Sequence, residues 1–161
     1  MAVLLGEKSR FAVEVGARAS GLRRVDLWVA DQWLTCDDNA VSVDQFRCSV
    51  EETVVSIRSG QVPALPFAAL SPVATHRRFV AATGDDPICN LREQFWFLRW
   101  GPTTDNLLTF AFLDGNHLAI TLQFWREAHL LDHPEHVGRV FEVANEPAEL
   151  AGTLESLASA L

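Results

Sequence analysis

A β-hairpin is predicted by residues 107–126, which read LLTFAFLDGNHLAITLQFWR. Apolar residues alternate with small or polar ones on either side of a turn that contains glycine, and this period of two is typical of strands. A three-residue turn at 114–116 sets Phe110 opposite Ile120, whereas a two-residue Asp-Gly turn sets it opposite Ala119. Because opposed residues share a face of the sheet, the hydrophobic pattern favours the three-residue turn.

A second hairpin is predicted over residues 25–36. Pairing Leu27 with Leu34 gives its two strands one apolar face. The residues Ala30 and Asp31 are not types that favour a two-residue turn. We therefore expect a four-residue loop over 29–32, which keeps the same register.

The register of this second hairpin sets Trp28 opposite Trp33. One interpretation is structural: the two rings form a cross-strand pair under a packed helix. The other is functional: the rings are an exposed aromatic anchor for a partner, since tryptophan is enriched at interface hot spots. Both interpretations stay open at the level of the sequence.

The remaining elements complete the prediction of the fold. Strand signals lie at residues 11–15, 95–100 and 139–143, and helix signals lie at residues 49–60, 71–82 and 145–161. The 95–100 segment is apolar on both faces, so we expect a central strand. A capping box of Ser49 and Glu52 is expected to begin the first helix, and Asn145 to cap the last. We predict an α+β fold, in which a single antiparallel sheet of about six strands carries about three packed helices.

Length and composition suit a single globular domain over residues 1–161. Cys36, Cys48 and Cys89 are an odd number of cysteines at wide spacings, which fits free thiols in a reducing compartment. The apolar residues 1–5 are too few for a signal peptide or a spanning helix. We therefore expect a cytoplasmic protein with no membrane partner.

The net charge of −8 comes wholly from the second half of the chain. Residues 1–80 carry nine Lys or Arg and nine Asp or Glu, whereas residues 81–161 carry four against twelve. A field of this sign repels phosphate and attracts basic surfaces. Direct nucleic-acid binding is therefore disfavoured, and a basic protein partner is favoured.

One cluster of potential metal ligands or general bases stands out. It comprises His129, Asp132, His133, Glu135 and His136. Pro134 disfavours helix at His133, so the rings of His129 and His133 are not expected to share a helix face. The segment is interpreted as a solvated connection between strands, with a metal or acid–base site as the alternative. We predict no metal site, no catalytic residue and no cofactor.

The remaining sequence features allow one alternative function, which is binding of a small ligand. There is no nucleophile elbow and no dinucleotide-binding glycine motif. Five tryptophans are many for a chain of this size. They allow a small-ligand-binding domain or small enzyme, with an aromatic pocket between the sheet and the 61–70 loop.

The opening segment supplies a resemblance. Residues 6–14 read GEKSRFAVE and are followed by the tryptophan-bearing hairpin and a strand-rich second half. This arrangement resembles bacterial immunity proteins of polymorphic-toxin systems. The resemblance implies a cytoplasmic, non-enzymatic inhibitor that occludes a toxin domain encoded nearby. An accessory subunit of a bacterial assembly is a further alternative.

A partner-binding surface can be predicted from charge and aromatic content together. The predicted residues are Glu127, Asp132, Glu135, Trp28 and Trp33. The three carboxylates fall in the histidine-bearing connection after the first hairpin, and none of them is explained by a turn or a helix cap. Charge complementarity at such a segment would speed the encounter with a basic partner.

Overall fold

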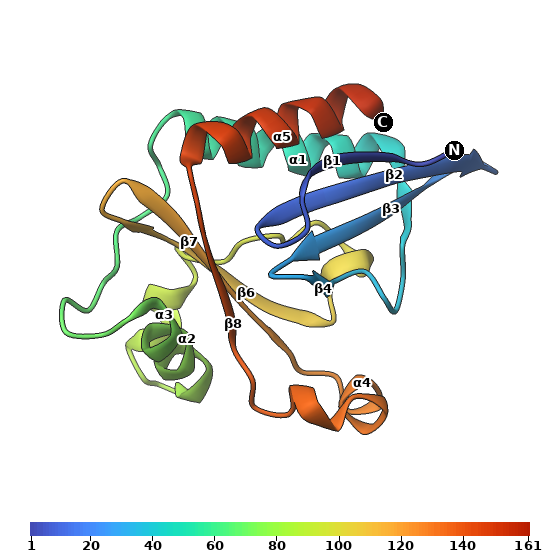
Figure 1. Ribbon diagram of the computed structural model, residues 1–161. Helices are drawn as coiled ribbons and strands as arrows, with labels where there is room; N and C mark the ends of the chain where they lie inside the picture. Colours follow the sequence, from blue (N-terminus) through green and yellow to red (C-terminus); the bar gives the residue numbers. More distant parts are fainter.

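The computed structural model describes residues 1–161 and has an α+β fold with two antiparallel sheets (Figure 1). The first sheet contains β1 (Val3–Glu7), β2 (Phe11–Ala19), β3 (Leu22–Val29), β4 (Gln32–Trp33) and β5 (Ala40–Ser42). The second contains β6 (Leu107–Asp114), β7 (His117–Phe124) and β8 (Phe141–Asn145). The helices are α1 (Val43–Arg58), α2 (Pro72–Ala81), α3 (Ile88–Arg92), α4 (Glu127–Asp132) and α5 (Pro147–Ala160). The prediction of a single six-stranded sheet with three helices is therefore wrong in its details.

The two sheets share one large hydrophobic core. Helices α1 and α5 lie side by side over the strands of the first sheet (Figure 1). The core contains 28 buried residues, drawn from both sheets and both of these helices. Burial of this apolar surface is the main force that holds the sheets together. None of the helices is long and apolar enough to cross a membrane.

The second sheet is buried on both faces. One face carries Leu118, Ile120 and Leu122 into the large core. The other face carries Phe110 and Phe112, which pack under α2. This smaller core contains four buried rings, which are Phe79, Phe95, Phe110 and Phe112. Helix α2 therefore covers the outer face of the β6–β7 hairpin.

Two-sided burial explains why the predicted register of this hairpin is wrong. The turn has two residues, Gly115 and Asn116, so Phe110 lies opposite Thr121 rather than Ile120. Gly115 has a φ of 61°, a conformation that glycine adopts without a steric penalty. The prediction matched apolar residues on the assumption that only one face is buried. With both faces buried, large rings on β6 pair across the strands with small or polar residues on β7.

The second hairpin keeps the predicted register but not the predicted loop. Trp28 pairs with Trp33 as expected, and Val29 pairs with Gln32. The turn is the two-residue Ala30-Asp31, with φ values of 52° and 61°. Positive φ at both positions belongs to the type I′ geometry, which matches the twist of the strands. Hairpin twist outweighs the unfavourable residue types here.

Residues 95–100 do not form the predicted central strand. They run along the free edge of β6, where the Phe97 amide donates to the Thr109 carbonyl at 2.9 Å. A single bridge joins Trp96 to Phe110. Leu98 has a φ of 57°, which breaks the extended conformation. The apolar run reflects burial of an irregular segment, and periodicity cannot distinguish that from a strand.

Two predicted helix starts are also corrected. Ser49 lies inside α1, which begins six residues earlier at Val43. Asn145 is the last residue of β8, and Glu146 occupies the N-cap position of α5. Helix α2 does begin at its predicted position, because the Ser71 hydroxyl caps it and accepts from the Ala74 amide at 3.1 Å.

Candidate partner-binding site

The tryptophan pair and the histidine segment meet at one hollow of about 300 Å³. Trp28 and Trp33 line it from the β3–β4 hairpin, and His129, His133 and His136 line it from α4 and the turn that follows. We call this feature the tryptophan–histidine hollow. Residues separated by about a hundred positions in the sequence therefore form one surface.

The tryptophan pair is stacked and partly open to solvent. The ring centroids of Trp28 and Trp33 are 6.1 Å apart with an interplanar angle of 18°. Trp33 is 39% exposed, so the pair is not sealed under a helix. The Lys8 ammonium lies 4.0 Å from the centroid of the Trp28 ring. One side of the pair is thus occupied by the protein itself, while Trp33 offers an accessible ring.

Asp26 holds the tryptophan pair in place, and sequence reasoning missed it. Its carboxylate is almost completely buried and accepts from the Trp33 indole at 3.0 Å. It also accepts from the Asn39 amide at 2.8 Å and from the Arg24 guanidinium at 2.8 Å. Three donors compensate the charge for its loss of water. An aspartate between the apolar residues Val25 and Leu27 of a predicted strand was the available signal.

The histidine rings stack on each other and on Phe124. His129 lies 4.2 Å from Phe124 at an interplanar angle of 13°. The ring centroids of His129 and His133 are 4.7 Å apart, although the two residues were not expected to share a helix face. Helix α4 does end at Asp132, before the residue that precedes Pro134. The last helical turn nevertheless brings His133 back over His129.

Burial controls the protonation of the groups in the hollow. Loss of water is the main cause that lowers the pKa of both His129 and His136. Charge repulsion from His133 lowers the pKa of His129 further, and repulsion from His129 does the same for His136. Burial raises the pKa of the Cys36 thiol to about 11, with the nearby Asp37 charge as a second cause. Cys36 is therefore a neutral thiol at neutral pH and not an activated nucleophile.

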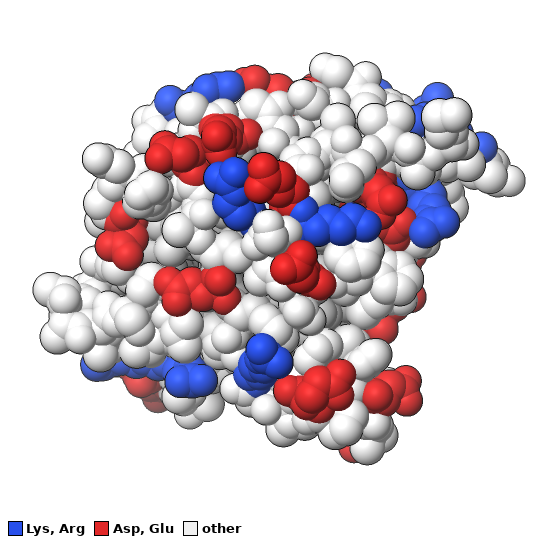
Figure 2. Space-filling model, in the orientation of Figure 1, with Lys and Arg blue, Asp and Glu red and all other residues white.

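The charge at the hollow is acidic. Asp31 and Glu135 line it, and no lysine or arginine does. Glu127 and Asp132 do not line the hollow, but both are exposed on the adjacent α4. Acidic side chains gather over the α4 end of the molecule, at the lower right of Figure 2. The structure thus brings Glu135 together with the tryptophans and leaves the other two predicted carboxylates beside them.

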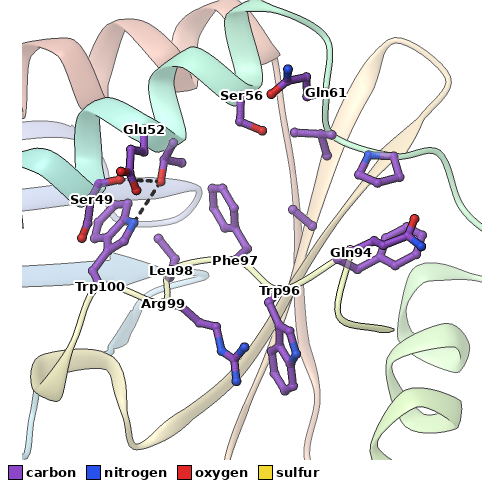
Figure 3. A pocket seen from close by; sticks show the side chains of 15 residues that line it. Ser49, Glu52, Ser56, Gln61, Gln94, Trp96, Phe97, Leu98, Arg99 and Trp100 are labelled. Atoms are coloured by element: carbon purple, nitrogen blue, oxygen red, sulfur yellow. Dashed lines mark hydrogen bonds between the residues drawn. The ribbon is translucent and has the colours of Figure 1, made fainter. Parts of the chain in front are cut away.

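A second hollow lies near the place where the alternative ligand pocket was expected. It has a volume of about 260 Å³ and is lined by α1, residues 61–63 and residues 94–100. Ser49, Glu52 and Ser56 reach it from the helix (Figure 3). Small-molecule sites usually have about 300–1,000 Å³. The volume gives the ligand-binding alternative little support.

The Gly6–Glu14 segment has structural roles in the β1–β2 hairpin. A Cβ atom at Gly6 would lie 2.3 Å from the Phe11 carbonyl oxygen, so only glycine fits there. Lys8 pairs with Glu14 at 3.1 Å. Arg10 pairs with Glu149 of α5 at 3.0 Å. The resemblance carried by this segment stays a prediction.

Comparison with known proteins gives a similarity of fold. No protein-family model matches the chain, and no curated protein sequence matches it. The fold is similar to the crystal structure of CdiI from Burkholderia dolosa AUO158, with a TM-score of 0.64. The similarity covers 98% of this chain and 99% of that chain at 10% sequence identity. Identity this low shows a shared fold and does not transfer individual residues.

Proposed function

We propose that the chain is a non-enzymatic immunity protein, which binds and occludes a toxin domain in the cytoplasm. The observation that carries the proposal is the similarity of fold to CdiI, an immunity protein, over nearly the full length of both chains. The resemblance of residues 6–14 to polymorphic-toxin immunity proteins points independently to the same class. An acidic binding protein also suits a basic toxin surface.

The tryptophan–histidine hollow and the adjoining α4 are the proposed partner-binding surface. Trp28 and Trp33 provide large rings at low entropic cost, which is the usual composition of an interface hot spot. Glu135 adds negative charge to the hollow, and Glu127 and Asp132 add it on the adjacent α4. This combination supports a partner with exposed arginine, because a guanidinium can stack on an indole ring and pair with a carboxylate.

The proposed function is tested by co-expression with the product of the neighbouring gene. We expect that product to be toxic by itself, to co-purify with this chain and to be neutralised by it in growing cells. If the two proteins neither bind in vitro nor rescue growth, the immunity role is wrong. All binding assays should contain a chelator, so that bound metal does not contribute.

Reversing the charges of Glu127, Asp132 and Glu135 to lysine is expected to slow association. Long-range attraction is then lost, so the association rate constant should fall about ten-fold at low salt and its salt dependence should flatten. Stopped-flow or surface-plasmon measurements over a series of salt concentrations give both quantities. A matched control reverses Asp44, Glu51 and Asp85, which are exposed elsewhere. Unchanged kinetics in the first variant, or equal slowing in the control, would reject the assignment.

Trp33→Ala is expected to weaken partner binding by at least 2 kcal/mol, or about 30-fold in Kd. The exposed ring is the part of the tryptophan pair that a partner can cover. Calorimetric titration measures the change, and a thermal melt checks that the variant folds. Trp125→Ala is the control, since Trp125 is 50% exposed and lines a different hollow. Equal losses in the two variants would contradict a specific role for Trp33.

A further inference from the structure

We propose that His133, Glu135 and His136 form a zinc site at the edge of the tryptophan–histidine hollow. His133 Nδ1 lies 3.3 Å from Glu135 Oε1, and His136 Nε2 lies 3.9 Å from the same oxygen. One potential ligand atom from each residue lies within 4.8 Å of the other two. The proposal goes beyond the immunity role and does not depend on it.

The separations are close to those that zinc requires. Bonds of about 2.0–2.2 Å in a tetrahedral site place the ligand atoms about 3.3–3.6 Å apart. The side chains of His133 and Glu135 are 49% and 58% exposed, so both can rotate by the small amount needed. Ion binding therefore needs only rotamer adjustments on the surface.

The third ligand, His136, is held by its surroundings. Its side chain is 13% exposed, and its ring stacks on Phe124 with centroids 5.0 Å apart. His136 Nδ1 lies 2.8 Å from Nε2 of the buried His129. A fixed imidazole beside two adjustable ligands gives the site one preorganised position.

The hydrogen bonds allow the protonation state that a metal ligand needs. If Nε2 of His136 binds the ion, its proton must be on Nδ1, from which it donates to Nε2 of His129. His129 then carries its own proton on Nδ1, which faces Cys36 Sγ at 3.7 Å. Asp37 offers a carboxylate to the same group of atoms. A hydrogen bond from the second nitrogen of a ligating histidine is the usual outer contact at zinc sites.

The donor set selects the kind of ion. Two imidazole nitrogens favour zinc and other late transition metals over Ca²⁺ and Mg²⁺, which prefer oxygen. Three protein ligands leave a fourth position for water or for a side chain of a partner. Because all three ligands line the hollow, that position is near the proposed partner-binding surface.

At the level of the sequence, a metal site in this segment was only the alternative to a solvated connection between strands. One reason was Pro134, since His129 and His133 were not expected to share a helix face; the other was the absence of a Glu-flanked zincin pattern. The centroids of these two rings lie 4.7 Å apart at an interplanar angle of 31°, and the ligand set uses His136 in place of an i, i+4 pair. The relevant spacing is His-x-Glu-His across a short 3₁₀ turn at residues 134–136.

The experiment titrates the metal-free chain with Zn²⁺ by calorimetry, with no partner present. We expect saturable binding of one ion per chain and a rise in Tm, because an ion that binds only the folded state stabilises it. Bound Co²⁺ should show the strong visible absorption of a four-coordinate site. His136→Gln and Glu135→Gln should each weaken Zn²⁺ binding at least ten-fold and abolish the rise in Tm.

Two further variants keep the test specific. His129→Phe preserves stacking on Phe124 but removes the hydrogen bond to His136, and we expect about ten-fold weaker Zn²⁺ binding. His117→Gln removes a histidine that lies near Glu146 at a separate place, with the two side chains 3.6 Å apart, and should bind as the parent does. Absence of saturable binding, or parental affinity in His136→Gln, overturns the zinc site. Since no partner is used, either result leaves the immunity role to its own test.

Discussion

Acidification from pH 6.5 to pH 4 is expected to lower the free energy of unfolding by about 3 kcal/mol through His76 alone. His76 is completely buried between α2 and the second sheet. Loss of water lowers its pKa from 6.5 to about 4, with a weaker contribution from the nearby Arg77 charge. The unfolded chain therefore binds a proton at this ring before the folded chain does. Stability is fully present above the unfolded pKa and is lost as the pH falls toward the folded pKa.

The neutral ring is well accommodated by its neighbours. Gln123 Oε1 can only accept and lies 3.3 Å from Nε2, which therefore carries the proton. Nδ1 then accepts from the Thr121 hydroxyl at 2.8 Å. Protonation adds a charge to a site without a carboxylate partner in these contacts. The cost is the desolvation of that charge.

Urea unfolding at a series of pH values measures the effect. In His76→Gln the loss of stability between pH 6.5 and pH 4 should be smaller by about 3 kcal/mol, even if the variant is less stable throughout. His117→Gln is the control, because it removes an exposed histidine from another part of the molecule. A parental slope in His76→Gln would show that other groups cause the acid sensitivity.

Phe110→Ala is expected to destabilise the fold by about 3–5 kcal/mol, which is usual for removal of a buried phenylalanine. Phe110 is completely buried. Its ring lies 4.4 Å from Trp96, 5.0 Å from His76 and 5.1 Å from Phe79. Truncation leaves a cavity at the centre of the smaller core. Urea unfolding at neutral pH measures the loss.

An exposed apolar residue provides the control for this substitution. Leu131 is 74% exposed on α4, so Leu131→Ala should change stability by less than about 0.5 kcal/mol. A loss below about 1.5 kcal/mol for Phe110→Ala would contradict close packing of α2 against the hairpin. It would also contradict the register that points Phe110 toward α2.

Local sequence signals predicted the elements that depend on local chemistry. Ser71 caps its helix and Pro134 ends α4 before His133, because both effects act within a few residues. The α+β class and the Trp28–Trp33 pairing also follow from local patterns. The β6–β7 register did not, because α2 covers a face that the pattern alone leaves open to solvent. Periodicity records which residues are apolar and not how many layers cover them.

The sequence predicted individual residues of the candidate site but not that they lie close together. Trp28, Trp33 and Glu135 were each selected, but whether they line one hollow depends on how the first sheet packs beside α4. Asp26 and Phe124, which support the tryptophan and histidine rings, carry no sequence signal beyond burial and charge. The sequence therefore identifies candidate residues of the site, whereas tertiary packing determines which of them come together.

The two cores of unequal size divide the molecule into parts that can open separately. Four rings hold α2 to the outer face of the β6–β7 hairpin, whereas 28 residues close the other side. Detachment of α2 would expose one face of the hairpin and leave the larger core closed, so we expect this helix to unfold locally. Phe124, which supports the histidine rings, belongs to the larger core. The larger core therefore supports the proposed partner-binding surface, and we expect that surface to persist when α2 detaches.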